Sequence, residues 1–456
     1  MEHGQFFHAL KIRTDLCIGC THCIQSCPTE ALRVHQGKAV LAENRCVDCG
    51  ECFRVCPVFA INIEQDDFDK IFQFKIRVAL VPTVFIGQFP EDISTDRIYS
   101  ALMRLGFTHV YEVEHGVEVL LPEMEKYLKD RQGVKPVMSS FCPAIVRLIQ
   151  VKFPAFTDHI MLLKPPVDIS AIYNRQRLID EGNSPDDIGL FYVTPCAAKI
   201  AAVKSPVGEK FSEVNGVINM NFLYNKVLSV IKQGSKEVNE SFARQSVQDK
   251  GIVWSLTRGE SRNLQGRCLA IDGIHNVMEF LEKLENQDVT DIDFLELRAC
   301  DESCAGGVLT SGNRFLTVER LHNRAEIASK RIMKGLEKPS SISRYHQQIQ
   351  KKLFVGKIKP RSMMKLDDDM AMAMKKMQQV HELLLYLPQV DCGTCGSPNC
   401  AALAEDIVQG KATISKCVFV HKLLEERGVF SADESVKVLE EIWGKEKFNR
   451  RWLLNL

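Results

Sequence analysis

Apolar and polar positions follow two alternating periods along the central part of the chain. Short runs rich in β-branched and aromatic residues stand at 78–85, 109–115, 189–195 and 293–299. Stretches with helical spacing separate them, a pattern typical of strand–helix–strand units around a largely parallel sheet. We therefore expect α/β layers between about residues 76 and 345, with functional loops at the carboxyl ends of the strands.

After this region the apolar pattern becomes helical. A stripe near helical spacing is expected to pack in a core or an interface, because methionine fills irregular apolar contacts. Asp367 to Asp369 suit the amino end of that helix. Ser431 and Glu434 have capping-box spacing, which predicts one amphipathic helix in the tail, packed within the fold rather than docked on a partner. The stripe consists of Met370, Met374, Met377, Leu384 and Leu387.

The length and the net charge of the chain limit the classes of protein to which it can belong. A chain of 456 residues is too long for one core, so two to four domains are expected. Its 58 basic residues balance 58 acidic ones, which gives no reason to expect nucleic acid or an anionic membrane as partner. The amino end lacks the layout of a signal peptide, and no apolar run reaches the length of a membrane span. We expect a cytoplasmic protein.

The 17 cysteines are the main chemical signal. Eight precede residue 60, five lie between 142 and 304, and four lie between 392 and 417. Disulfides are disfavoured in the cytoplasm, so clustered cysteines there indicate metal ligands or redox groups.

The first eight cysteines form an exact internal repeat. The spacing Cys-x2-Cys-x2-Cys-x3-Cys-Pro begins at Cys17 and again at Cys46, and it is the pattern of bacterial two-cluster ferredoxins. Each loop wraps three thiolates round one [4Fe–4S] cluster with backbone N–H groups turned toward sulfur, and the fourth cysteine reaches the other cluster. A pair of zinc knuckles is the alternative. The expected ligand sets are Cys17, Cys20, Cys23 and Cys56 for one cluster and Cys27, Cys46, Cys49 and Cys52 for the other.

The last four cysteines have a different spacing. Cys392, Cys395, Cys400 and Cys417 are separated by two, four and sixteen residues. Four thiolates would also suit zinc. The spacing resembles a small [4Fe–4S] module of anaerobic redox proteins, which favours a third cluster.

Three middle segments carry a further resemblance. They read SSFCP at 139–143, TPCAAKIAA at 194–202 and ELRACDESCAGG at 296–307. In this order behind a two-cluster domain, they resemble the three signatures of the catalytic domain of [FeFe]-hydrogenases, T-S-C-C-P, M-P-C-x-x-K-x-x-E and E-x-M-A-C-x-x-x-C-x-x-G-G. The segment VPTV at 81–84 is similar to the family's A-P-S-V strand end. The resemblance covers about residues 1–345.

This resemblance implies an H-cluster. Its [4Fe–4S] part, the fourth such cluster of the chain, would be held by Cys142, Cys196, Cys300 and Cys304. Cys304 would bridge to a diiron subsite carrying CO, cyanide and an azadithiolate, and Lys199 would donate a hydrogen bond to a cyanide. Cys268 is left over and is expected to be a small buried hydrophobe. Other residues implied at the subsite are Pro82, Thr83, Thr194 and Arg298.

Four departures from the signatures change the expected activity. Phe141 stands where fast hydrogenases carry a proton-relaying cysteine, and Ala202 replaces a glutamate of the same path. Positioned proton transfer contributes about 10² to 10⁴-fold, so turnover should be slow. Thr194 and Arg298 replace two methionines and make the subsite more polar, unless Arg298 turns outward along its strand.

The sequence therefore predicts a slow, sensory [FeFe]-hydrogenase that interconverts protons and H₂ and passes electrons through its clusters. A ferredoxin or a signalling kinase or phosphatase is the expected redox partner, and a homodimer is allowed. One alternative is a hydrogenase-like iron–sulfur protein without the diiron subsite, acting in cluster assembly or as an electron relay. Another is a catalytically biased hydrogenase that feeds a ferredoxin or flavodoxin.

The expected fold class is a multidomain α/β protein. A ferredoxin-like two-cluster domain precedes a hydrogenase domain with two α/β lobes, and a small helical iron–sulfur domain follows. The expected boundaries are 1–75 for the two-cluster domain, 76–345 for the hydrogenase domain, 346–388 for a helical linker, 389–430 for the C-terminal module and 431–456 for a helical tail.

Overall fold

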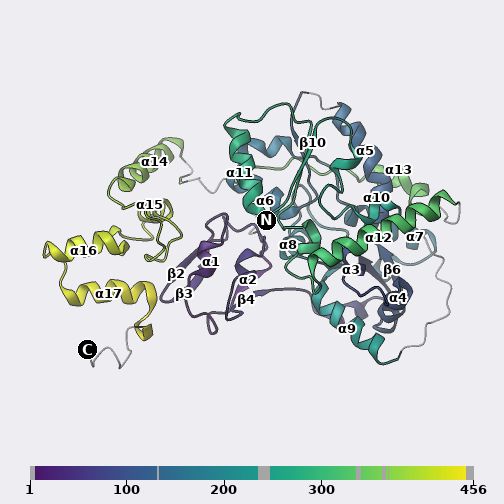
Figure 1. The fold of residues 1–456 in the computed structure, drawn as a ribbon, viewed down its shortest axis with the longest axis horizontal. Coiled ribbons are helices and arrows are strands. Elements are labelled where there is room, and N and C mark those ends of the chain that lie inside the picture. Colours follow the sequence, from purple (N-terminus) through teal and green to yellow (C-terminus); the bar gives the residue numbers. More distant parts are fainter. Residues whose placement is uncertain are drawn as a thin grey trace. The chain divides into compact units, whose positions relative to one another are not determined.

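The computed structural model of the chain describes residues 6–130, 133–234, 247–334, 340–361, 366–367 and 369–447. It divides into two compact units. We call Glu64–Pro360 the central unit, and the second unit, which joins Met1–Ile63 with Arg361–Leu456, the terminal unit. In Figure 1 the terminal unit carries the purple and yellow ends of the colour scale. The fold class is the expected one, mixed α/β with a ferredoxin-like amino-terminal part and a helical carboxyl-terminal part.

The central unit contains two parallel sheets, as the alternating pattern predicts. One has the strand order β6-β5-β8-β9 and the other the order β10-β11-β7, and all their pairings are parallel. The strands are β5 (Ile76–Val81), β6 (His109–Glu112), β7 (Val137–Met138), β8 (Ile188–Thr194), β9 (Gly216–Asn219), β10 (Cys268–Ile271) and β11 (Phe294–Leu297).

Helices connect these strands and surround the sheets (Figure 1). The expected strand at 78–85 ends early, because Pro82 lacks an N–H for the ladder and the chain turns into a short helix at Thr83. The α-helices of the unit are α3 (Thr83–Ile86), α4 (Thr95–Arg104), α5 (Val117–Asp130), α6 (Pro143–Lys152), α7 (Pro166–Asp180), α8 (Ala197–Lys204), α9 (Met220–Lys232), α10 (Asp249–Ile252), α11 (Ile274–Glu285), α12 (Arg314–Met333) and α13 (His346–Gln350).

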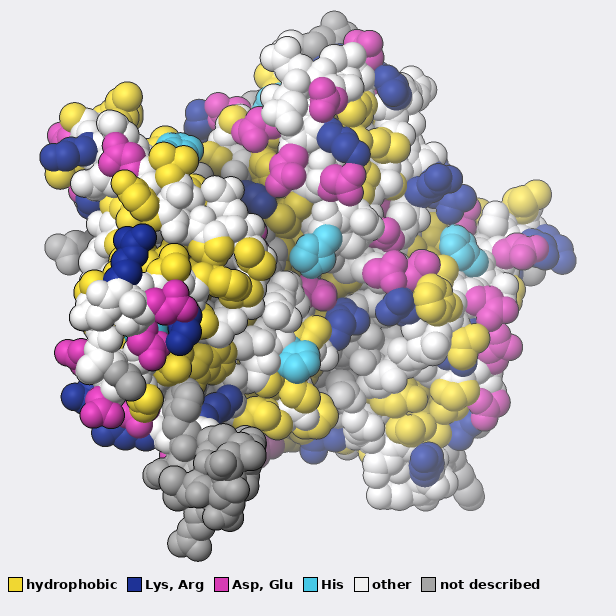
Figure 2. Space-filling view, turned by 60° about the vertical axis from the view of Figure 1, so that its left-hand side comes forward, with side chains coloured by type: hydrophobic (Ala, Val, Ile, Leu, Met, Phe, Trp, Pro, Cys, Tyr) yellow, Lys and Arg dark blue, Asp and Glu magenta, His cyan; other side chains and the backbone are white. Residues whose placement is uncertain are grey.

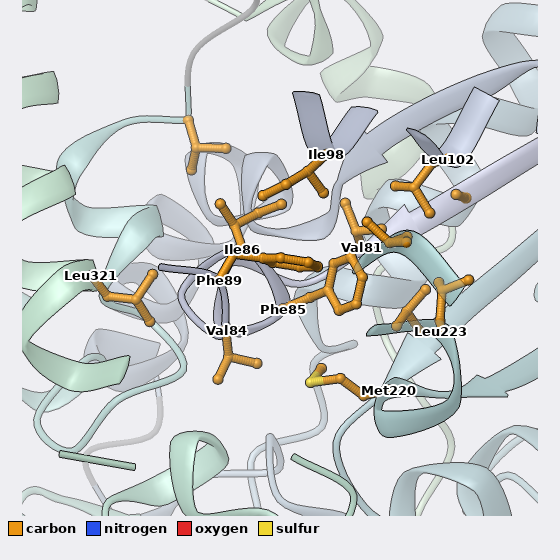
Figure 3. Packing of buried hydrophobic residues seen from close by; sticks show 14 of the residues in the cluster. Val81, Val84, Phe85, Ile86, Phe89, Ile98, Leu102, Met220, Leu223 and Leu321 are labelled. Carbon is orange, nitrogen blue, oxygen red and sulfur yellow. The ribbon is translucent and has the colours of Figure 1, made fainter. Parts of the chain in front are cut away.

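A large apolar core fixes the four-stranded sheet (Figure 3). Val81 from β5 packs with Phe85 and Phe89 just after it, and the two rings meet edge to face with centroids 5.3 Å apart. Leu223 from α9 and Leu321 from α12 close the cluster. Because this core holds the carboxyl end of β5, the loops that follow the parallel strands have a rigid base.

The amino-terminal part of the terminal unit is built from two small antiparallel sheets. Strand β1 (Leu10–Ile12) pairs with β4 (Ile61–Ile63), and β2 (Leu32–His35) pairs with β3 (Lys38–Leu41). Two one-turn helices, α1 (His22–Gln25) and α2 (Glu51–Arg54), stand between the strands.

The carboxyl-terminal part is helical. Its α-helices are α14 (Met370–Leu384), α15 (Cys400–Val408), α16 (Val418–Glu426) and α17 (Ala432–Trp443). Asp369 caps α14 by accepting a hydrogen bond from the Met372 N–H, and the predicted capping box of Ser431 and Glu434 is confirmed at α17. Asp368 and residues 448–456 of the predicted tail lie outside the described residues.

The prediction that the methionine stripe packs in a core is wrong for its amino-terminal half. Met370 and Met374 are exposed by 78% and 67%, and Met377 is also exposed. Packing begins one turn further along, where Val380 and Leu387 join a cluster with Leu403 and two cysteines. The other part of the prediction, that these methionines pack in an interface with a partner, stays a prediction.

Charged side chains are mixed over the surface. Figure 2 shows Lys and Arg interspersed with Asp and Glu on the visible face, in keeping with the equal numbers of basic and acidic residues. Among the described helices, none combines the length and apolar character needed to cross a membrane.

Candidate functional site

Four cysteines of the central unit follow the carboxyl ends of parallel strands, and we call them the central site. Cys142 follows β7, Cys196 follows β8, and Cys300 and Cys304 follow β11. Burial raises the pKa of Cys196 to about 12, and the nearby Cys304 and Cys142 raise it too. A raised pKa at Cys196 fits a bound metal, whose charge stabilises a thiolate.

Two glycines allow the loops of the central site to approach each other. A Cβ atom on Gly306 would lie 1.9 Å from the Asp301 carbonyl oxygen. A Cβ atom on Gly307 would lie 2.5 Å from the Pro195 carbonyl oxygen, next to Cys196. A side chain at Gly307 would therefore push the Cys304 loop away from the Cys196 loop, and one at Gly306 would disturb the Cys300–Cys304 loop itself.

Lys199 projects from the first turn of α8 into the central site. Its side chain is buried, and its Nζ atom donates a hydrogen bond to the Cys304 Sγ atom over 3.2 Å. Burial opposes the charge, but the interaction with Cys304 and other acidic groups raises the pKa of Lys199 well above its ordinary value. The site thus contains a fixed cation beside Cys304.

The ring of Phe141 contacts two cations. The Lys199 Nζ atom is 4.5 Å from the centroid of its ring, and the Arg298 Cζ atom is 4.0 Å from the same centroid. Both contacts are within the range of cation–π attraction, which strengthens when the cation is desolvated. Arg298 therefore points inward, and the alternative of an outward orientation is excluded.

Two buried carboxylates balance Arg298. The Nη2 atom of Arg298 is 3.4 Å from Glu260 Oε2 and 3.5 Å from Glu296 Oε1. Burial raises the pKa of Glu260 to about 7, against the opposing effect of Arg298. Among the atoms that the structure describes, Arg298 Nε and Nη1 have no hydrogen-bond partner. These two N–H groups are free to hold an anionic ligand.

A cavity opens beside Cys304. It encloses about 680 Å³ of empty space, part of it open to solvent, and Cys304, Lys199 and Phe141 line it together with Pro82 and Ala202. The two positions that depart from the proton path of the resembled family, 141 and 202, thus face one space. Neither side chain there can carry a proton.

The same cavity is lined by acids that the sequence analysis missed. Burial raises the pKa of Glu114 to about 8 and that of Asp168 to about 7. Glu114 Oε2 accepts a hydrogen bond from the Thr83 N–H over 2.8 Å. Glu114 is the second residue after β6, so the rule that functional residues follow the carboxyl ends of strands could have found it.

Two of the predicted subsite residues use their hydroxyl groups elsewhere. Thr83 Oγ1 donates to the Ile252 carbonyl oxygen, and Thr194 Oγ1 donates to the Cys196 carbonyl oxygen. Thr194 also accepts a hydrogen bond from the Cys196 N–H. Both residues position backbone around the site, and neither hydroxyl is turned to the cavity.

In the terminal unit the repeated cysteines gather into two sets. Cys23 interacts electrostatically with Cys17, Cys20 and Cys56, and burial raises the pKa of Cys23 to about 12. We call this set the first ferredoxin site. Cys27 interacts in the same way with three other cysteines. This second ferredoxin site consists of Cys27, Cys46, Cys49 and Cys52.

Backbone N–H groups point at the sulfurs in matching positions of the repeat. The Ala31 N–H donates to Cys27 Sγ and the Ala60 N–H to Cys56 Sγ, each over 3.2 Å. Such donors stabilise negative charge on sulfur, so they suit ligated thiolates. Each donor lies four residues after its cysteine.

His8 and Asp48 form a buried pair beside the second ferredoxin site. The His8 Nδ1 atom is 2.8 Å from Asp48 Oδ2, and with Cys46 they make a group compact enough for one metal ion. Asp48 Oδ1 already accepts the Ala9 N–H over 2.9 Å. Since Cys46 belongs to the cysteine repeat, this pair is best understood as a structural tie between the amino end and the cysteine loop.

The last cysteines also meet. Cys395 interacts electrostatically with Cys417 and Cys392, and Cys400 packs in the same apolar cluster. We call these four the C-terminal site. The remaining cysteine, Cys268, is only half-buried, and its thiol donates to the Gln265 carbonyl oxygen over 3.6 Å. The expectation of a buried hydrophobe is therefore met in part.

Comparison with known protein families agrees with these sites. Residues 75–225 match the C-terminal domain of the iron-only hydrogenase large subunit. Residues 10–63 match a 4Fe-4S dicluster domain, and residues 387–419 match a family described as an Fe-S cluster. Residues 75–225 thus carry a domain of the iron-only hydrogenase family. As a hydrogenase-like iron–sulfur protein, it is expected to use iron rather than zinc at its cysteine sites.

Individual relatives are distant. Iron hydrogenase 1 of Clostridium pasteurianum is 23% identical over 254 residues, which cover 52% of this chain and 42% of the relative. The periplasmic [Fe] hydrogenase large subunit of Nitratidesulfovibrio vulgaris is 28% identical over 215 residues, 42% of this chain and 50% of the relative. The chain thus spans half or less of the length of these curated relatives.

Solved structures of [FeFe]-hydrogenases also align with this chain, at low identity. One variant of the Chlamydomonas reinhardtii enzyme aligns with a TM-score of 0.49 and 14% identity, covering 65% of this chain and 97% of that one.

Proposed function

We propose that this protein is a slow [FeFe]-hydrogenase that senses H₂ or redox state. The central site supports an H-cluster because it brings the thiols of Cys142, Cys196 and Cys304 together, with a buried cation at Cys304 and an adjoining cavity. Cys142, Cys196, Cys300 and Cys304 would hold its [4Fe–4S] part, with a diiron subsite beside Lys199 and Pro82. When bound, that subsite supplies the reaction 2H⁺ + 2e⁻ ⇌ H₂.

The chain's own side chains would bind and orient the anionic ligands of the subsite. Lys199 offers a charge-assisted hydrogen bond, and Arg298 offers two unpartnered N–H groups. The buried carboxylates of Glu260 and Glu296 hold Arg298 in place from the other side.

One observation supports the proposal that H₂ turnover is slow. Phe141 contacts both Lys199 and Arg298 and lines the cavity, where a proton donor is needed. Ala202 also lines the cavity. Protons must therefore reach Cys304 without a side-chain relay at position 141 or position 202. A rate loss of about 10² to 10⁴-fold follows from the absence of positioned proton transfer.

The remaining parts of the proposal concern electrons and partners. Sixteen cysteines would hold four [4Fe–4S] clusters, in the central, C-terminal and two ferredoxin sites. The output would pass to a ferredoxin or to a signalling kinase or phosphatase. The alternative of a relay or assembly protein without the diiron subsite gains no support from the relatives, which are named as hydrogenases.

Infrared spectroscopy tests the proposal. Protein matured anaerobically with the diiron assembly machinery should show CO and cyanide stretching bands that shift under H₂. Cys304→Ser, matured in parallel, should lack them. If verified maturation leaves the wild-type protein without these bands, the hydrogenase proposal is wrong.

A further inference from the structure

The two ends of the chain form one continuous structure in the terminal unit. The Val34 N–H on β2 donates to the Gly396 carbonyl oxygen over 2.7 Å, and the Gly37 N–H donates to the Ile442 carbonyl oxygen over 2.8 Å. The β2–β3 hairpin is thereby bonded both to the cysteine loop before α15 and to the end of α17 (Figure 1). Backbone hydrogen bonds of this kind fix register as they do between strands.

Charged side chains reinforce this contact away from solvent. Arg45 pairs with Glu405 on α15, and both are more than nine-tenths buried. Arg33 Nε lies 2.6 Å from Asp406 Oδ2. Because removing one partner of a buried ion pair leaves an uncompensated charge, loss of either Arg45 or Glu405 alone would destabilise this contact.

Two glycines allow the amino-terminal and carboxyl-terminal parts of the terminal unit to lie close together. Gly396 has φ +83°, and a Cβ atom there would lie 2.5 Å from the Val34 carbonyl oxygen. Gly37 has φ +70°, and a Cβ atom there would lie 2.3 Å from the Trp443 carbonyl oxygen. Both positions need glycine for conformation and for space.

The contact joins two cysteine sites. Val34 lines the cavity ringed by Cys17, Cys20, Cys23 and Cys56, the first ferredoxin site. Gly396, its hydrogen-bond partner, directly follows Cys395 of the C-terminal site. The hydrogen bond between Val34 and Gly396 therefore connects the wall of the first ferredoxin site with the wall of the C-terminal site.

We propose that the C-terminal site exchanges single electrons with the first ferredoxin site through the Val34–Gly396 contact, within one chain. This inference rests on the proposed cluster content. In each transfer one site is oxidised by one electron and the other is reduced by one, so no further reactant is needed. The C-terminal site would then be the end of an internal electron path rather than a separate sensor.

Electron paramagnetic resonance tests the path. In full-length, cluster-loaded protein reduced with dithionite, the signals of the C-terminal and first ferredoxin sites should show mutual spin–spin interaction. Cys417→Ser should remove the C-terminal signal together with that interaction, and it identifies the pair involved.

A matched pair of glycine variants tests the contact itself. Gly396→Ala should weaken the interaction because its Cβ atom collides with Val34. Gly393→Ala is the control, since Gly393 has φ +70° in the same loop, but its nearest contact would be 3.7 Å away. Iron and cluster content are measured for both variants.

The outcomes separate the two proposals. Loss of the interaction in Gly396→Ala, with its retention in Gly393→Ala, supports the path. Iron at both sites of the wild-type protein without spin–spin interaction overturns the path and leaves the cluster assignment intact. Zinc at the C-terminal site of anaerobically loaded protein overturns the cluster assignment, and the path with it.

Discussion

Glu114 should make the stability of the central unit depend on pH. Its carboxyl group is buried behind the cavity, and burial raises its pKa from 4.5 to about 8. In the unfolded chain the same group ionises near pH 4.5. Between these values unfolding releases a proton, so the free energy of unfolding falls as the pH rises, by about 1.4 kcal/mol for each pH unit.

Glu114→Gln removes this dependence while it keeps the acceptor for the Thr83 N–H. At pH 7 the wild-type carboxyl costs about 3 kcal/mol relative to the neutral amide. For a unit of roughly 300 residues this corresponds to a melting temperature about 5 °C higher in the variant. The difference should shrink to about 1 °C at pH 5, near the ordinary pKa of the group.

Differential scanning calorimetry of the protein without clusters, from pH 5 to pH 8, measures this difference. The exposed Glu319→Gln is the control and should leave the melting temperature unchanged throughout. If Glu114→Gln melts at the wild-type temperature at both pH 5 and pH 8, the buried group is not neutral and the reasoning fails.

Three further variants probe the site and the terminal unit. Phe141→Cys should raise H₂-dependent dye reduction by the matured protein about 10²-fold or more, and an unchanged rate would contradict the relay argument. Phe141→Leu keeps an apolar side chain but loses both cation–π contacts, so urea unfolding should show a loss of about 2 kcal/mol; a loss under about 0.5 kcal/mol would mean that the stacking adds no stability. Gly37→Ala should cost more than about 1 kcal/mol in thermal unfolding because of its φ of +70° and the clash with Trp443. Gly410→Ala, with φ +72° and no atom within 4 Å of the added Cβ, shows the conformational part alone and should cost less.

Local patterns predicted the positions of the cysteines well. Cys196 and Cys300 follow strands that the β-rich runs at 189–195 and 293–299 identify, and each cysteine comes after the carboxyl end of a parallel strand. The repeat from Cys17 and Cys46 likewise specifies its loops by spacing alone. These features depend on neighbours within a few residues, so the sequence contains them directly.

Contacts between distant residues could not be predicted. Arg45 and Glu405 are 360 positions apart, and nothing in either segment shows that the two ends of the chain share one unit. The orientation of Arg298 depends on Glu260, which lies in a loop without regular spacing. The methionines of α14 fit helical periodicity, but periodicity does not reveal which neighbour covers a helix face.

The substitutions at the central site depend on one another physically, which bears on whether the proposed slow rate is incidental. Replacing Phe141 with cysteine alone would remove the aromatic ring that both Lys199 and Arg298 contact. Replacing Arg298 with methionine alone would leave two buried carboxylates without their cation, a change that typically costs about 3 to 5 kcal/mol. A site that is both faster and as stable would therefore require coordinated changes at position 141, at position 298 and at the carboxylates behind it. The side chains around Phe141 thus form a stable arrangement that lacks a proton relay. This supports the proposal of a sensor over that of an enzyme for bulk H₂ turnover.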